Sequence, residues 1–163
     1  MNYDVQLGTR AGAGHLAVVR LRARPEELST VVPAGCGKVW NVIRTRHIAG
    51  AGRHVALYLD AQINLEVGVE LDAPFPADDD GDVVGSRFPV GDVASTVHFG
   101  PYHELRAAHA AIREWCAREG RALAGPNWEV YDHWRDEWNR DPSQIRTDVF
   151  YLLKPTLKPH DQA

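Results

Sequence analysis

The stretch Gly100–Gly120, GPYHELRAAHAAIREWCAREG, decides the fold because it contains the clearest helix pattern in the chain. Pro101 stands where a first helical residue is common, and Gly120 stands where a helix commonly ends. The sequence therefore predicts an amphipathic helix between these two residues. Side chains recurring at steps of three and four residues form its apolar face: Leu105, Ala108, His109, Ile112 and Cys116.

Strand patterns stand on both sides of this helix. Before it, residues 83–100, VVGSRFPVGDVASTVHFG, are strand material that is broken at residues 89–92. After it come residues 121–134, RALAGPNWEVYDHW, and residues 147–154, TDVFYLLK. The second half of the chain is therefore predicted to run strand, helix, strand, strand.

The same order occurs once before, in the first half of the chain. Residues 15–23, HLAVVRLRA, predict a strand, and residues 54–60 and 64–71, HVALYLD and NLEVGVEL, alternate as the two half-buried strands of a hairpin. A helix is predicted between the first strand and the hairpin, with its regular part beginning near Pro33. Its stripe consists of Val32, Cys36, Val39, Trp40, Ile43 and His47.

An acidic linker separates the two copies. Residues 72–82, DAPFPADDDGD, combine two prolines with a run of aspartates, which is typical of a solvated loop. We predict one α+β domain over residues 1–163, with repeat one at about 3–71, repeat two at about 83–155 and a short C-terminal tail. The two βαββ repeats are expected to pair about a pseudo-twofold axis, with the helices on one side of the sheets. A ligand cleft is expected between the repeats, on the side away from the helices.

One acid stands out within the predicted strands. Alternation places Trp128 and Val130 on one face of their strand, which we expect to meet the helices because it is the more apolar. Glu129 and Tyr131 then share the open face. The corresponding strand of the first repeat adds Tyr58, aligned with Tyr131, and the next strand is expected to extend this face with Glu66 and Glu70.

This combination suits a cationic or amine-bearing ligand, because aromatic faces attract positive charge and a carboxylate neutralises it. On pattern alone, the favoured interpretation of Glu129 is a solvent-facing residue beside ordinary sheet tyrosines, since alternating strands are common and buried acids are rare. The residues by themselves leave both interpretations open.

Residues 97–131, VHFGPYHELRAAHAAIREWCAREGRALAGPNWEVY, followed by residues 146–153, RTDVFYLL, resemble the GyrI-like small-molecule-binding domain, the effector-binding domain of AraC-type and MerR-type regulators. The doubled strand-helix-strand-strand order matches as well. The recurring elements are Gly100-Pro101-Tyr102 at a helix start, Trp115 near the helix end, Glu129-Val130-Tyr131, and the Thr147-Asp148 pair.

The resemblance implies two repeats around a central cleft that takes hydrophobic, often cationic compounds. It makes Glu129 the leading ligand contact, and its walls would be Tyr131, Tyr58, Trp40 and Tyr102. A further candidate contact is Asp148, which stands where such domains commonly carry the Glu of a Thr-Glu pair and is one methylene shorter. The resemblance also implies a stand-alone domain, because only about 15 residues precede the first clear strand.

An enzymatic alternative belongs to the same resemblance. Some stand-alone domains of this kind are hydrolases that open reactive cyclopropane-bearing natural products. In that interpretation Glu129 would be the general base that orients or deprotonates a water molecule. Sequence spacing does not separate a base from a counter-ion, so both roles stay open.

Charge and composition limit the other classes of function. A net charge of −4 without a basic run gives no long-range attraction to phosphate backbones, so no direct nucleic-acid binding is expected. No stretch is apolar enough to predict export or membrane insertion. A cytoplasmic protein without a cofactor is expected. The run Asp78-Asp79-Asp80 leaves a basic protein partner as a weaker hypothesis.

Several motif-like stretches are interpreted as structural. HELRAAH spaces its histidines, His103 and His109, six residues apart, which places them on different faces of a helix, so no metal site is predicted. AGCGKV lacks the hydroxyl residue and the earlier glycine of a phosphate loop. Cys36 and Cys116 sit in apolar stripes as small hydrophobic residues. Core packing is the favoured role for the Trp40 and Trp115 side chains.

Overall fold

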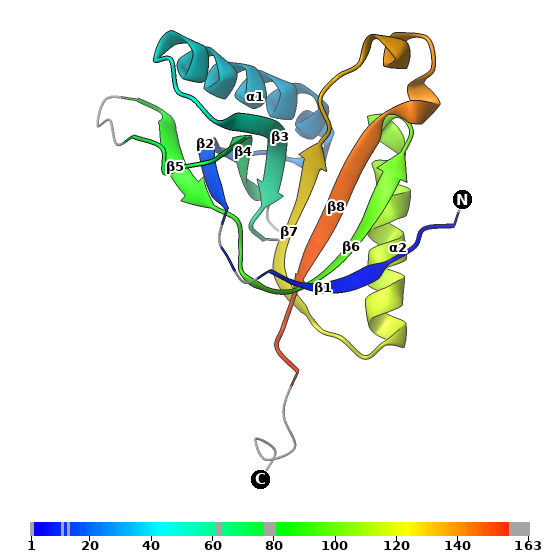
Figure 1. Ribbon diagram of the computed structural model, residues 1–163. Coiled ribbons are helices and arrows are strands. Elements are labelled where there is room, and N and C mark those ends of the chain that lie inside the picture. The colour runs from blue at the N-terminus through cyan, green and yellow to red at the C-terminus, as the bar shows by residue number, and fades with distance from the viewer. Residues whose placement is uncertain (1, 11, 13, 61–62, 77–80, 157–163) are drawn as a thin grey trace.

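A computed structural model of the chain describes residues 2–10, 12, 14–60, 63–76 and 81–156. Its described part contains one antiparallel sheet of eight strands and two α-helices, α1 (Leu28–Thr45) and α2 (Leu105–Arg118) (Figure 1). The strand order is β1-β6-β8-β7-β3-β4-β2-β5. The strands are β1 Gln6–Arg10, β2 His15–Arg22, β3 Ala51–Tyr58, β4 Asn64–Leu71, β5 Val83–Arg87, β6 Gly91–Phe99, β7 Leu123–Tyr131 and β8 Arg146–Leu153.

The predicted α+β class is confirmed, and each half of the chain contains the predicted order of elements. The first half runs β2-α1-β3-β4 and the second runs β6-α2-β7-β8. The two halves meet where β3 pairs with β7, with Ala56 directly opposite Glu129. The predicted hairpin is β3 with β4, in which Ala56 lies opposite Val67.

Each of the two edge strands, β1 and β5, lies within one predicted repeat and pairs with a strand of the other. β1, which the sequence analysis did not predict, pairs with β6 of the second half, while β5 pairs with β2 of the first half. The strand pairing therefore departs from the predicted repeat boundaries of 3–71 and 83–155. The polar, exposed sequence of β1, QLGTR, explains why no strand pattern was visible there. The aspartate run 78–80 and residues 157–163 of the tail lie outside the described residues.

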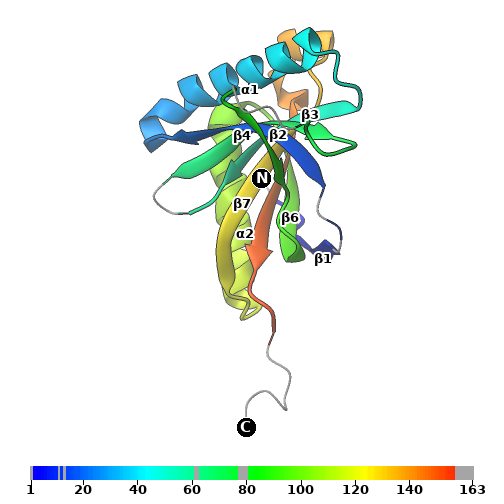
Figure 2. The same cartoon turned by 90° about the vertical axis from the view of Figure 1, so that its left-hand side faces the viewer.

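Both helices lie on the same side of the sheet, and each covers one half (Figures 1 and 2). α1 packs on β2, β3 and β4, and α2 packs on β6 and β8. Gly35 lets α1 approach closely, because a Cβ there would lie 3.1 Å from Val19 and 3.2 Å from Val67. Tyr131 packs against the cores under both helices, so its side chain lies where the two halves join.

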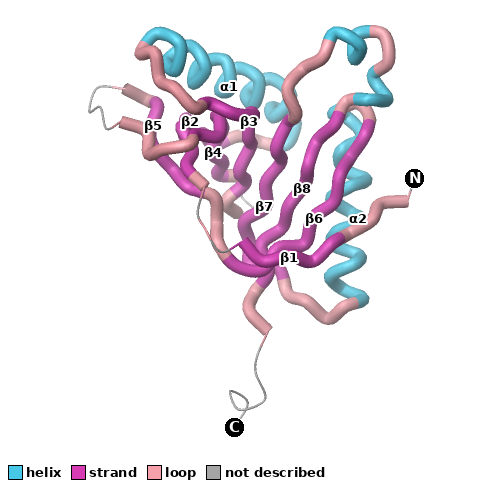
Figure 3. The backbone as a smooth tube through the Cα atoms, viewed as in Figure 1, coloured by secondary structure: helices cyan, strands magenta, loops and turns pink. Residues whose placement is uncertain are grey.

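The face of β7 that meets the helices is the opposite of the predicted one. Glu129 and Tyr131 lie on the helix side, whereas Trp128 and Val130 lie on the opposite side. The sheet is curled (Figures 2 and 3). Trp128 is nevertheless 0% exposed, because an apolar cluster is buried on that side too. Arg10 of β1 lies over the cluster, 4.4 Å from the Phe88 ring. This cluster also contains Leu16, Val18, Val55, Leu57 and Val93.

The helix boundaries match the prediction for α2 and correct it for α1. Gly120 has φ +66° just after α2, as predicted for a helix end. α1 begins at Leu28, so Pro33 lies inside it rather than at its start. A 3₁₀ turn at Pro25–Glu27 provides the actual entry into α1. Neither described helix has the length and apolar character needed to cross a membrane.

Candidate functional site

The Glu129 carboxylate lies buried on the helix side of β7, near the centre of the sheet. It is 5% exposed and has Ala56 of β3 on one side and Val149 of β8 on the other. Its Oε1 accepts hydrogen bonds from the hydroxyls of Tyr131 (2.7 Å) and Tyr58 (3.2 Å). Its Oε2 lies 2.9 Å from Nε2 of His109 on α2. Both oxygens of this acid are therefore held in place by the protein.

The other nitrogen of His109 extends this arrangement to β8. Its Nδ1 lies 2.7 Å from the hydroxyl of Tyr151, which also accepts a hydrogen bond from Arg113 at 3.1 Å. The His109 and Tyr151 rings meet edge to face with centroids 5.5 Å apart. We name Glu129, Tyr58, Tyr131, His109 and Tyr151 the Glu129 cluster.

The strands bring these side chains together through register and alternation. Tyr58 lies two residues beyond Ala56 on β3, and Tyr131 lies two residues beyond Glu129 on the antiparallel strand β7. Their side chains therefore reach the carboxylate from opposite directions on one face. His109 reaches the carboxylate from α2, where it is half-buried next to the buried Ala108.

The tyrosines of the cluster remain protonated donors at neutral pH. Burial raises the pKa of Tyr58 and of Tyr131, and the nearby negative charge of Glu129 raises both further. Burial also raises the pKa of Tyr151, although Arg113 opposes this rise. The phenols therefore present O–H groups to their neighbours.

Two more exposed aromatic residues stand near the cluster. Tyr102 is 43% exposed and meets the Tyr131 ring edge to face, with centroids 5.6 Å apart. Trp40 of α1 is 38% exposed and contacts His54, the β3 neighbour of Tyr131, at a centroid distance of 6.0 Å. The core role favoured for Trp40 is therefore wrong, because this residue is exposed rather than buried in the core.

Glu66 and Asp148 do not join the cluster. Glu66 lies opposite Leu57 rather than Ala56, which places it on the other face, where it pairs with Arg20 at 3.1 Å. Asp148 lies on that face as well, with Arg53 at 3.4 Å and Arg146 at 3.0 Å. The prediction that Glu66, Glu70 and Tyr58 share a face is wrong, because the hairpin register places the two glutamates on the face away from Tyr58. Glu70 instead binds Arg53 at 3.0 Å.

Comparisons with known proteins show the fold. No protein-family model and no curated protein matches the sequence. Among solved structures, the C-terminal domain of EcmrR superposes with a TM-score of 0.73 at 19% identity, covering 96% of this chain and 100% of that one. A hydrolase from Listeria innocua has a TM-score of 0.60 at 12% identity, covering 93% of this chain and 92% of that one. SAV2435 bound to tetraphenylphosphonium has a TM-score of 0.52 at 9% identity, covering 94% of each chain.

The chain has a GyrI-like fold. At these identities the superpositions establish the arrangement of helices and strands. The chemistry of the site has to be inferred from the side chains of this chain. Within the GyrI-like fold, five of the seven predicted site residues lie on the helix side of the sheet or on the elements beside it. They are Glu129, Tyr131, Tyr58, Trp40 and Tyr102.

Three residues of the site were not predicted from the sequence: His109, Arg113 and Tyr151. His109 carried a signal, because it is a polar side chain within an otherwise apolar helix stripe. The other histidine of HELRAAH, His103, points to Glu104 at 3.8 Å, so the two histidines do not converge. The described residues contain no group of three or more side chains placed to hold a metal ion.

Two buried polar atoms flank Tyr131 and have no hydrogen-bond partner within the described part of the chain. They are Nε2 of His54 on β3 and Oγ1 of Thr147 on β8, and both residues lie directly opposite Tyr131 in the sheet. Burial and the nearby His133 lower the pKa of His54, so its ring is neutral at pH 7.

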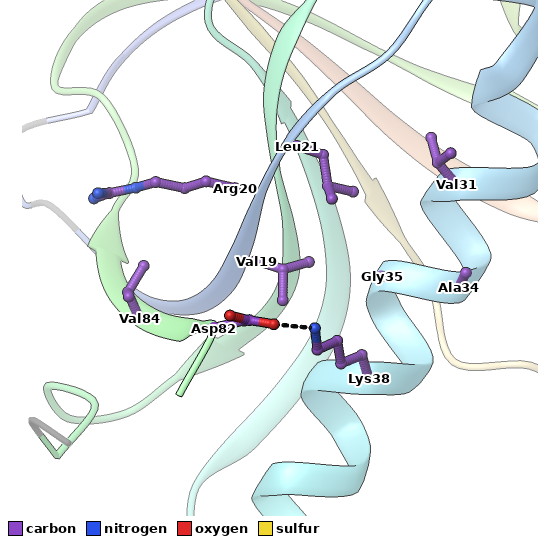
Figure 4. Close-up of a pocket in the computed structure, with 9 residues that line it drawn as sticks. All are labelled: Val19, Arg20, Leu21, Val31, Ala34, Gly35, Lys38, Asp82 and Val84. Atoms are coloured by element: carbon purple, nitrogen blue, oxygen red, sulfur yellow. Dashed lines mark hydrogen bonds and ion pairs between the residues drawn. The ribbon is translucent and has the colours of Figure 1, made fainter. Parts of the chain in front are cut away.

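A separate pocket of the GyrI-like fold lies between α1 and strands β2 and β5 (Figure 4). It has a volume of about 400 Å³ and is lined mainly by aliphatic side chains such as Val19 and Val31. Lys38 and Asp82 also line the pocket and form an ion pair at 2.5 Å. Among the described residues that line this pocket none is aromatic, and the carboxylate of Asp82 is already paired with Lys38, so the pocket is a weaker candidate than the Glu129 cluster.

Proposed function

We propose that the chain binds a hydrophobic small-molecule cation on the helix side of the sheet, with Glu129 as its counter-ion. One observation carries the proposal: Glu129 is a buried carboxylate that no lysine or arginine of the described chain pairs with. Buried charges are costly unless they are paired, so such a carboxylate is suited to an external cation. Sensing or sequestering such a compound would use the same site.

The aromatic residues beside Glu129 suit the same ligand. The Tyr102 and Tyr131 rings are in contact, and Tyr102 is partly exposed, so a cation could approach a ring face and the carboxylate together. Trp40 adds an exposed ring from α1. The solved complex of SAV2435 with tetraphenylphosphonium supports this proposal, because that protein has the same fold and binds a hydrophobic cation.

Hydrolysis is the second candidate, supported by the contact between His109 and Glu129. A carboxylate joined to an imidazole, which is joined in turn to Tyr151, provides groups that can exchange protons. A Listeria innocua hydrolase shares the fold. However, Glu129 already accepts two tyrosine hydrogen bonds besides the His109 contact, which leaves little capacity to take a proton from water. The counter-ion role is therefore favoured.

Isothermal titration with tetraphenylphosphonium tests the binding proposal. We compare the wild type with Glu129→Gln and with Glu66→Gln, because both substitutions remove one charge from a buried carboxylate without changing its shape. Glu66 is 6% exposed and lies on the opposite face. The proposal predicts that affinity falls at least roughly tenfold in Glu129→Gln and stays near the wild-type value in Glu66→Gln. Equal affinities for all three folded proteins would reject the counter-ion role.

Turnover separates the two candidate functions. A panel of reactive cyclopropanes and esters is incubated with the wild type and with Glu129→Gln, and product is counted per protein. Product well above one equivalent that is lost in Glu129→Gln would favour the hydrolase. Product that stays at or below one equivalent would remove support for catalysis in this class.

A further inference from the structure

We infer that His109 makes the site selective for cations that carry no N–H groups, such as quaternary ammonium or phosphonium ions, over primary ammonium ions. The inference rests on the proposed function and concerns the same site. It follows from counting the hydrogen bonds that the carboxylate of Glu129 already accepts inside the protein. The selectivity-determining contact is that of His109 with Oε2.

The carboxylate of Glu129 has little hydrogen-bonding capacity left for a ligand. An ionised carboxylate offers about four lone-pair positions on its two oxygens. Oε1 uses its positions for Tyr58 and Tyr131, and Oε2 uses one for His109. About one position therefore remains, on Oε2. The negative charge itself remains available to a cation nearby.

The network behind His109 fixes which of its nitrogens carries the proton. Arg113 can only donate, so the Tyr151 oxygen accepts its hydrogen bond. The single hydroxyl hydrogen of Tyr151 is then free to point at Nδ1 of His109, 2.7 Å away. A neutral imidazole that accepts at Nδ1 carries its hydrogen on Nε2, where it donates to Glu129. Tyr151 and Arg113 thereby keep a donor pointed at Oε2.

A primary ammonium ion brings three N–H donors to this site and finds about one free acceptor position on the carboxylate. The phenol oxygens of Tyr58 and Tyr131 could accept a bond, but they carry no charge. Water has little access to Glu129, so an unmatched N–H group lowers affinity by roughly tenfold. A quaternary ion has no N–H group to satisfy and gains its attraction from the charge and the aromatic rings.

A matched pair of ligands tests the inference: 2-naphthylmethylammonium and its N,N,N-trimethyl derivative. Isothermal titration gives the ratio of their dissociation constants. Because methylation alone also reduces hydration, the measured quantity is the change of this ratio between proteins. His109→Leu removes the donor, whereas His109→Gln can place an amide N–H near the Nε2 position. We expect a wild-type preference for the quaternary ion of about tenfold or more. The preference should fall at least about fivefold in His109→Leu and stay within about twofold in His109→Gln.

Tyr151→Phe provides a second variant that leaves His109 in place. Without the phenol hydroxyl, Nδ1 loses its partner, so the ¹⁵N signals of the His109 ring should show a mixture of tautomers and the preference should fall in parallel. His103→Leu, an exposed histidine at the start of the same helical segment, is the control and should leave the ratio unchanged.

The outcomes separate this inference from the function on which it rests. If neither ligand binds the wild type, the proposed function fails and the inference fails with it. If both ligands bind, and Glu129→Gln weakens both, the proposed function holds. An unchanged preference in folded His109→Leu and Tyr151→Phe would then overturn the selectivity role of His109 alone.

Discussion

Nε2 of His109 lies 2.9 Å from Oε2 of Glu129, and this contact ties α2 to the central strand β7. Glu129 also binds Tyr58 of β3, so one carboxylate contacts side chains from both halves of the chain. A buried acid held in this way stabilises the junction of the halves and presents a negative charge at a defined position. The same residue therefore serves the structure and the proposed site.

The two tyrosines that bind Oε1 should differ in their effect on stability. Tyr131 donates at 2.7 Å and packs against the cores under both helices, whereas Tyr58 donates at 3.2 Å. We expect Tyr131→Phe to lower the free energy of unfolding by about 1–3 kcal/mol and Tyr58→Phe by about 0.5–1.5 kcal/mol. Urea unfolding followed by circular dichroism measures both. A larger loss in Tyr58→Phe would contradict this order of strengths.

Gly35 and Gly37 of α1 form a matched pair for testing the approach of α1 to the sheet. A Cβ at Gly37 meets nothing within 4 Å, so Gly37→Ala should raise the free energy of unfolding by up to about 1 kcal/mol. A Cβ at Gly35 would lie 3.1–3.3 Å from Val19, Val67 and Leu21. Gly35→Ala should therefore be less stable than Gly37→Ala by about 1 kcal/mol or more. Equal stabilisation in both variants would show that α1 shifts freely.

Alkaline pH should destabilise the protein through its tyrosines. The pKa values of Tyr58 and Tyr131 are raised in the folded protein, so folding favours their protonated forms. Their stabilisation is fully present below the unfolded pKa of about 10 and is lost as pH rises above it towards the folded values. Unfolding at several pH values measures this loss, and Tyr58→Phe should make it shallower. Absorbance at 295 nm that shows all tyrosines ionising near pH 10 in the native state would contradict it.

Acidic pH should destabilise the protein through protonation of His54. Burial lowers its folded pKa below the usual value, with His133 adding a smaller effect. The neutral ring therefore stabilises the fold above the unfolded pKa of about 6.5, and this contribution is lost as pH falls through the folded value. Titration by ¹H NMR should place the His54 pKa below 6.5, and His133→Asn should move it upwards. A normal His54 pKa would show that the ring is more hydrated than its buried Nε2 indicates.

Alternation in the sequence predicted which side chains share a face, and it did so for Glu129, Tyr131 and Tyr58. It could not tell which face the helices cover. The usual rule that the more apolar face meets the helices failed for Trp128, because this curled sheet buries an apolar cluster on the helix-free side as well. The carboxylate of Glu129 can be buried on the helix side because its oxygens form hydrogen-bond contacts with His109, Tyr58 and Tyr131 there.

The partners of Glu129 on other elements were harder to predict. His109 lies 20 residues from Glu129 in the chain, and their contact depends on how α2 packs over β6 and β8, next to β7. No local pattern encodes that placement. The prediction for Glu66 failed for a local reason. A change of one position in the hairpin register moves a side chain to the other face of the sheet.

A crystal structure of the complex with tetraphenylphosphonium tests the central claim most directly. We expect the phosphorus to lie on the helix side of the sheet, with a phenyl ring against Tyr102 or Tyr131 and Glu129 as the nearest carboxylate. A cation bound instead in the pocket beside Lys38, or against Phe88 on the opposite face, with the Glu129 cluster unchanged, would contradict it.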